Sequence, residues 1–148
     1  MTRNRLGPVI VAVLALAVAL APAPAAAAAT FIPMSDLKWS AAAVPGVSTA
    51  VVEGDMTKGP SLFYLKYDAG LVTPVHHHSP DHYVTVMSGT LVLTVDGKEH
   101  ILGPGSFFAL TGKAKHAARV EGKEPAVMFI DARGAWDVVP ESAAADKE

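Results

Sequence analysis

The sequence contains no cysteine, and this absence excludes several kinds of site at once. A disulfide framework, a thiolate zinc site and a catalytic thiol all require cysteine. Any metal must therefore be bound by histidine or oxygen ligands. The sequence also lacks a block of basic residues, because its 12 Lys and Arg are spread along the chain among 14 Asp and Glu. A protein that follows nucleic-acid phosphates needs such a block, so we expect no nucleic-acid partner.

Residues 1–29 have the three parts of a secretory signal peptide: a short basic start, the apolar run Val9–Leu20, and a run of alanines before Thr30. The alternative is an uncleaved membrane anchor. Against it, the apolar run is shorter than the roughly 20 residues that a spanning helix needs, and two prolines follow it. We therefore expect cleavage before Thr30, and a secreted or periplasmic protein without membrane association after cleavage.

Removal of these 29 residues from the 148 leaves 119, with ten basic and fourteen acidic side chains and a net charge of −4. This length is enough for one compact core and too short for two ordinary domains. We expect a single domain over residues 30–140, followed by a disordered tail over 141–148.

The mature chain has the pattern of an all-β protein, because no window sustains a helical apolar period and short β-branched runs alternate with Gly and Pro. Asp96–Gly97 is the strongest signal for a hairpin turn. Nine short strands with tight turns indicate a sandwich or barrel. The expected strands are Val47–Val52, Leu62–Tyr67, Val75–His78, His82–Ser88, Thr90–Val95, Glu99–Leu102, Phe107–Leu110, His116–Val120 and Ala126–Asp131.

Four of the six histidines are spaced for a metal site. His76 and His78 lie two residues apart in an expected strand, so their side chains point to the same face. His82 and His116 each begin a further strand and share the parity of its apolar, inward-facing residues. Closure of a barrel would bring all four together.

Metal coordination is one of the few ways in which several imidazoles can share an apolar interior without leaving lone pairs unsatisfied. The sequence thus predicts one divalent metal ion on His76, His78, His82 and His116. Four neutral ligands leave the ion its full charge, which favours small anionic or enolate-like substrates.

The same residues resemble the first motif of the cupin superfamily: Gly70, five residues, His76-x-His78, three residues, a ligand position at 82, six residues and Gly89. A degenerate second motif begins at Gly97 and ends at His116, without the usual proline near Thr111. The resemblance covers roughly residues 47–131. It implies a jelly-roll barrel, or double-stranded β-helix, that is often dimeric. It also implies the ligand set His76, His78, His82 and His116.

At position 82 the common cupin pattern has glutamate, so the chain is similar to a subset of single-domain cupins with four histidines. That resemblance implies Mn or Fe, with Zn, Ni or Cu as alternatives, and a dioxygenase-type oxidoreductase acting on a small oxygen-bearing molecule. The superfamily also holds isomerases, lyases, sugar binders and zinc domains. A metal-assisted lyase or isomerase, and a non-catalytic binder with a closed zinc site, are therefore the alternatives.

Several other polar and aromatic residues are assigned to the surface, to turns or to packing. Parity directs His77 and Arg119 outward, and His100 is expected on the surface. Asp81 is expected to accept a hydrogen bond within its turn. Trp39 and Trp136 lie on either side of the expected barrel segment and are expected to seal its ends or a dimer contact. No residue is assigned as a general base.

Overall fold

The computed structural model describes residues 28–141, and its regular elements are almost all strands. They belong to a folded unit that begins at Phe31. No helix among the described residues is long and apolar enough to span a membrane. The expected signal peptide, residues 1–29, lies outside the described residues except for its last two. In chain order the elements are η1 (Met34–Asp36), β1 (Ser40–Ala41), β2 (Val47–Gly54), β3 (Ser61–Tyr67), β4 (His76–His77), β5 (His82–Ser88), β6 (Thr90–Val95), β7 (Lys98–Leu102), β8 (Phe107–Leu110), β9 (His116–Glu121), β10 (Ala126–Ala132) and β11 (Val139–Pro140).

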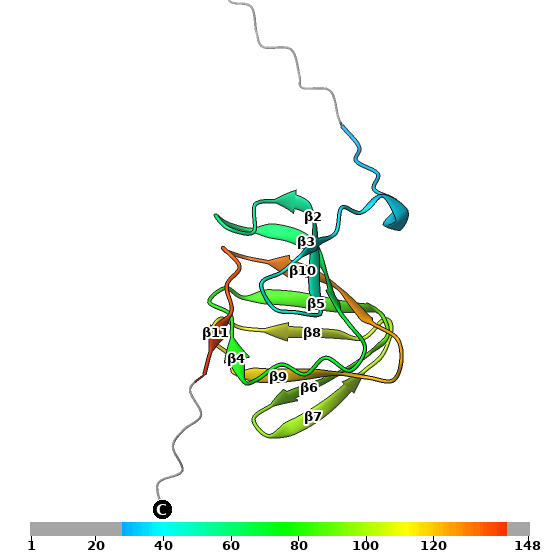
Figure 1. Cartoon of the computed structure of the whole chain (residues 1–148). Coiled ribbons are helices and arrows are strands. Elements are labelled where there is room, and N and C mark those ends of the chain that lie inside the picture. The colour runs from blue at the N-terminus through cyan, green and yellow to red at the C-terminus, as the bar shows by residue number, and fades with distance from the viewer. Residues whose placement is uncertain (1–27, 142–148) are drawn as a thin grey trace, which may run out of the picture. The chain divides into compact units, whose positions relative to one another are not determined.

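The strands form two antiparallel sheets (Figure 1). One has six strands in the order β1-β2-β3-β10-β5-β8, and the other has five in the order β11-β4-β9-β6-β7. From β3 onward the chain passes repeatedly from one sheet to the other, so β3, β4 and β5 lie in alternate sheets. This topology confirms the expected all-β class and explains why histidines at β4, β5 and β9 can approach one another between the sheets.

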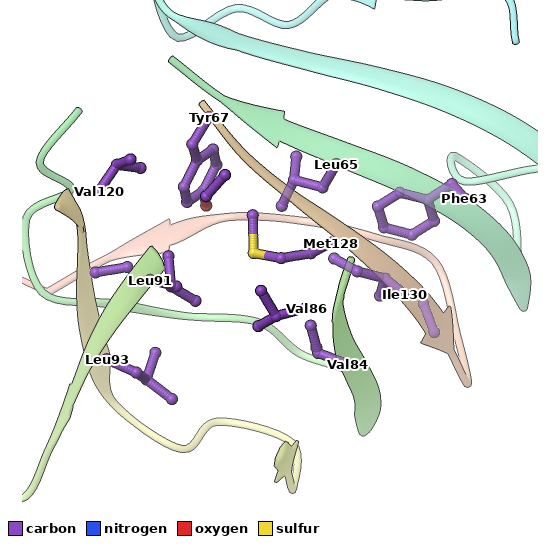
Figure 2. Packing of buried hydrophobic residues seen from close by; sticks show 13 residues of the cluster. Phe63, Leu65, Tyr67, Val84, Val86, Leu91, Leu93, Val120, Met128 and Ile130 are labelled. Atoms are coloured by element: carbon purple, nitrogen blue, oxygen red, sulfur yellow. The ribbon is translucent and has the colours of Figure 1, made fainter. Parts of the chain in front are cut away.

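Core packing follows the two-residue alternation of the strands. β3 and β10 pair along their whole lengths, and in both strands every second side chain is buried. Figure 2 shows these side chains meeting Leu91 and Leu93 of the opposite sheet in one hydrophobic cluster. Complete burial of an aliphatic or aromatic side chain contributes about 1.5–3 kcal/mol. His78, His82 and His116 lie beside side chains of this cluster around a small internal cavity.

Two turns show why glycine occupies its positions. Asp96 and Gly97 both have positive φ, 49° and 72°, which is the two-residue hairpin that the Asp–Gly pair predicts between β6 and β7. Gly89 has a φ of +73°, and a Cβ atom there would lie 2.3 Å from the carbonyl oxygen of Pro125. Only glycine therefore fits between β5 and β6.

The expected strands correspond to β2 through β10, with boundaries that agree to within two residues. The two-residue strands β1 and β11 are additional. They are too short to show an alternating pattern in the sequence. β11 pairs with β4 and so brings the end of the described chain next to the histidines. Glu141, the first residue of the expected tail 141–148, donates its backbone N–H to the Val75 carbonyl oxygen at 3.0 Å. Residues 142–148 lie outside the described residues.

Burial distinguishes two isoleucines and predicts their stability effects. Ile130 in β10 is 2% exposed, whereas Ile101 in β7 is 70% exposed. We expect Ile130→Ala to lower the free energy of unfolding by about 2–5 kcal/mol, because it leaves a cavity in the core. The matched control Ile101→Ala should change it by less than about 0.5 kcal/mol. Urea unfolding measures both, and equal effects of the two substitutions would contradict the assigned core.

Candidate metal centre

The histidines reach the interior from both sheets. His76 in β4 and His116 in β9 are direct partners across the five-stranded sheet, and His78 follows β4 with the same parity as His76. His82 opens β5 in the six-stranded sheet. All four side chains are buried, with relative exposures between 3% and 5%. As predicted from alternation, the intervening His77 points elsewhere.

Three of the four histidines form a close cluster. Candidate ligand atoms of His76, His78 and His116 lie within 4.8 Å of one another. His82 is not part of this group: its ring centroid lies 4.9 Å from that of His78 but 6.1 Å from that of His116. Of the four predicted ligands, the structure therefore brings three into one cluster, with His82 beside it. The difference arises because His82 alone comes from the opposite sheet.

Every one of these imidazoles donates from Nδ1 to a backbone carbonyl. The acceptors are Pro74 for His76 at 2.8 Å, Pro80 for His82 at 3.2 Å, Ala114 for His116 at 2.9 Å, and Asp137 for His78. A carbonyl oxygen only accepts, so Nδ1 must carry the proton and Nε2 the lone pair. These bonds hold the rings with Nε2 free, which is the form that binds a metal. The donor set thus fits a divalent ion.

Burial keeps His78, His82 and His116 uncharged at neutral pH. It lowers the pKa of His78 to about 3 and that of His116 to about 4, against the opposing effect of their carbonyl acceptors. Burial also lowers the pKa of His82. Neighbouring imidazoles act in the same direction, because two adjacent positive charges repel each other. At pH 7 these three rings are therefore neutral ligands that need not lose a proton to bind a metal.

The segment Trp136–Asp137 holds His78 in place. The Trp136 indole stacks on the His78 imidazole with ring centroids 3.9 Å apart, and the Asp137 carbonyl is the acceptor for His78 Nδ1. The Asp137 carboxylate in turn accepts from Ser79 N at 2.7 Å and Ser79 Oγ at 2.5 Å. The sequence analysis assigned Trp136 to packing and missed Asp137. Contacts across 58 residues leave no local pattern from which either role could be read.

The remaining predicted positions lie away from the cluster. His77 Nδ1 is 2.6 Å from Glu141 Oε1, and Arg119 pairs with Glu99 on the outer face of its sheet. His100 is exposed in β7. The Asp81 carboxylate accepts from the Gly112 backbone N–H at 2.5 Å, a bond across 31 residues and not the bond within its own turn that the sequence predicted. Trp39 is half-buried, and Lys66 Nζ lies 4.8 Å from the centroid of the Trp39 ring.

Little space remains inside the barrel beside His78, His82 and His116. A cavity of about 30 Å³ lies there and is lined by Phe108 and Trp136 among other side chains. That volume holds one or two water molecules. No Asp, Glu, Lys or Arg lines it among the described residues. An ion at the histidines would meet small ligands on this side.

Comparison with known proteins identifies the kind of fold that this architecture represents. The family model for the cupin domain matches residues 63–132, which include all four histidines. The fold is a cupin fold. No curated protein sequence matches the chain.

Solved cupin structures resemble the chain in fold at low sequence identity. The polyketide cyclase RemF from Streptomyces resistomycificus is 18% identical, with a TM-score of 0.65 over 79% of this chain and 88% of that chain. KdgF from Halomonas sp. is 21% identical, with a TM-score of 0.59 over 72% and 94%. An oxalate oxidase in complex with glycolate is 18% identical, with a TM-score of 0.55 over 70% and 59%. Likeness at this level establishes the fold alone.

The low pKa values predict how the metal-free protein responds to acid. Unfolded histidine titrates near 6.5, whereas His78 and His116 stay neutral in the folded protein down to about 3 and 4. Between pH 7 and pH 5 the unfolded state therefore gains protons that the folded state does not, and the free energy of unfolding falls. The slope approaches about 1.4 kcal/mol per pH unit for each such histidine. Urea unfolding in the presence of a chelator measures it.

Two variants separate this effect from general acid sensitivity. His78→Gln should reduce the pH dependence between pH 7 and pH 5, because glutamine does not titrate. His100→Gln changes an exposed ring and should leave the dependence as it is. Equal slopes in the wild type and His78→Gln would contradict the assigned pKa values.

Asp137 is expected to support metal affinity through His78. Asp137→Ala removes the two bonds to Ser79 and frees the segment that supplies the His78 acceptor, so metal affinity should fall about 10- to 100-fold. Asp55→Ala is a matched control, because the Asp55 carboxylate makes the same two bonds to Thr57 in an exposed turn. Competition with a chromophoric chelator measures both affinities. Equal losses would show that Asp137 has no specific role.

Proposed function

We propose that the protein is an exported, metal-dependent cupin that binds one divalent ion through His76, His78, His116 and His82. The observation that carries this proposal is the common Nδ1-to-carbonyl bond of the four buried rings. His82 joins the set because its Nδ1 is oriented in the same way and its ring is as buried as the others. The signal-peptide pattern of residues 1–29 supports export.

The activity that we propose is that of a dioxygenase-type oxidoreductase acting on a small oxygen-bearing molecule, with Mn or Fe favoured. When bound, such an ion acts as a Lewis acid and supplies redox chemistry at its open positions. The similarity to an oxalate oxidase supports an oxidative reaction, and the similarity to a polyketide cyclase supports an oxygen-bearing substrate.

The chain's own residues would prepare this site in three ways. The neutral imidazoles leave the positive charge of the ion uncompensated, which favours an ionised oxygen donor. Trp136 and Phe108 restrict the space to a few water-sized ligands and so exclude bulk water. Burial raises the pKa of the Tyr67 hydroxyl to about 12, so this group at the same cavity is a proton donor in hydrogen bonds and not a base.

Metal content tests the ligand set directly. The untagged protein should retain about one Mn or Fe per chain, and His76→Ala, His82→Ala and His116→Ala should each lower that content severalfold. His100→Ala is the matched control and should retain the wild-type content, because that ring is exposed on β7. Elemental analysis after dialysis measures it, and oxygen uptake with candidate substrates tests the reaction.

Each outcome separates the candidates. Unchanged metal in His82→Ala would reduce the ligand set to the cluster of three. One tightly held Zn without oxygen uptake would favour the non-catalytic binder with a closed site. Turnover that consumes no oxygen would favour a metal-assisted lyase or isomerase, and absence of metal would overturn the proposal.

A further inference from the structure

A second, larger cavity lies beside the histidine cluster. Its volume is about 490 Å³, and both His76 and His78 line it. Its other walls come from the loop between β1 and β2, from residues 72–74, and from residues around β11. Trp136 and Tyr67 border both this cavity and the small one inside the barrel. The larger cavity is therefore the space through which a small molecule would approach the cluster.

The walls of this cavity are almost entirely apolar. Val44, Val47, Met56, Leu65 and Val138 are among the residues that line it. No Asp, Glu, Lys or Arg lines it among the described residues. A carboxylate, phosphate or sugar would lose its hydration there without gaining a charged or amide partner. The cavity thus disfavours charged and strongly polar ligands.

Three of the side chains at the cavity use polar atoms in hydrogen bonds to the backbone. Thr73 Oγ1 donates to the Ala118 carbonyl at 3.3 Å and accepts from the Ala118 N–H at 2.8 Å. Nδ1 of His76 and Nδ1 of His78 donate to their backbone acceptors. The hydroxyls of Thr49 and Tyr67 add two further polar groups. Tyr67 is only 9% exposed and lies beside Leu65 at the edge of the core cluster in Figure 2.

We infer that this cavity binds a molecule with an uncharged, mostly apolar body, about the size of one or two aromatic rings, that presents an oxygen donor to the histidine-bound metal. This inference rests on the proposed function, because the oxygen donor needs a metal at His76 and His78. It narrows the substrate class: the apolar body would fill the cavity, and the oxygen end would lie at the ion. Hydrophobic burial supplies the affinity, and the metal supplies the orientation.

Two hydroxamates test whether an apolar body strengthens the binding of a ligand that coordinates the metal through oxygen. They share one metal-binding group and differ in their apolar part. The intact protein is loaded with Zn²⁺, which excludes oxidation, and each affinity is divided by the affinity of the same probe for aqueous Zn²⁺. After this correction benzohydroxamate should bind about tenfold or more tightly than acetohydroxamate. 4-Carboxybenzohydroxamate should lose that gain. Equal corrected affinities of the first two probes would overturn the inference.

A second experiment tests the apolar cavity without any metal. It uses the uncharged fluorescent probe N-phenyl-1-naphthylamine and two valine variants. Val44 lines the cavity and is 49% exposed, whereas Val51 is 46% exposed on β2 and does not line it. Val44→Asp should weaken probe binding about tenfold or more, because it places a charge in the apolar wall, and Val51→Asp should leave it unchanged. Equal effects of the two substitutions, or no binding to the wild type, would overturn the inference.

The two experiments together distinguish a failure of the inference from a failure of the proposed function. If the protein retains no Zn²⁺ while Val44→Asp alone weakens the fluorescent probe, the metal proposal fails and the apolar ligand class is supported. If Zn²⁺ is retained and the phenyl ring gives no gain, the metal proposal stands and the inferred ligand class is wrong.

Discussion

Hydrogen bonds from imidazole Nδ1 to backbone carbonyls determine how this site can work. Without them, four buried histidines would be free to rotate and to exchange tautomers, and their lone pairs would not be directed to one point. With them, each ring presents Nε2 while its other nitrogen is satisfied. The same burial that lowers the pKa of His78 and His116 keeps these rings neutral. Orientation therefore comes from the hydrogen bonds and neutrality from burial, which outweighs the opposing effect of those bonds on the pKa.

Three of the four acceptor carbonyls are local in sequence, and the fourth comes from a distant segment. Three of the acceptors lie two residues before the histidine that donates to them, in the segment that leads to its strand: Pro74, Pro80 and Ala114. The fourth acceptor, Asp137, belongs to the segment that runs back from β10 to β11. That segment also stacks Trp136 on His78, so the C-terminal part of the described chain closes the site between the two sheets.

The sequence predicted what depends on local pattern. Alternation placed His76 and His78 on one face, Asp96–Gly97 indicated the hairpin, and the inward parity of His82 and His116 was confirmed by their burial. Of the adjacent aromatic residues in β8, Phe107 is 61% exposed and Phe108 takes the inward position. Asp137, Trp136 and the greater distance of His82 from His116 depend on the packing of distant strands, which a single sequence does not encode locally.

The tautomer of the histidines is the most direct test of this account. A long-range ¹H–¹⁵N correlation spectrum of the ¹⁵N-labelled, metal-free protein at pH 7 separates the two neutral forms and the imidazolium ion. We predict that His76, His78, His82 and His116, assigned through single substitutions, carry the proton on Nδ1. Protonation on Nε2, or a charged imidazolium at His78 or His116, would contradict it.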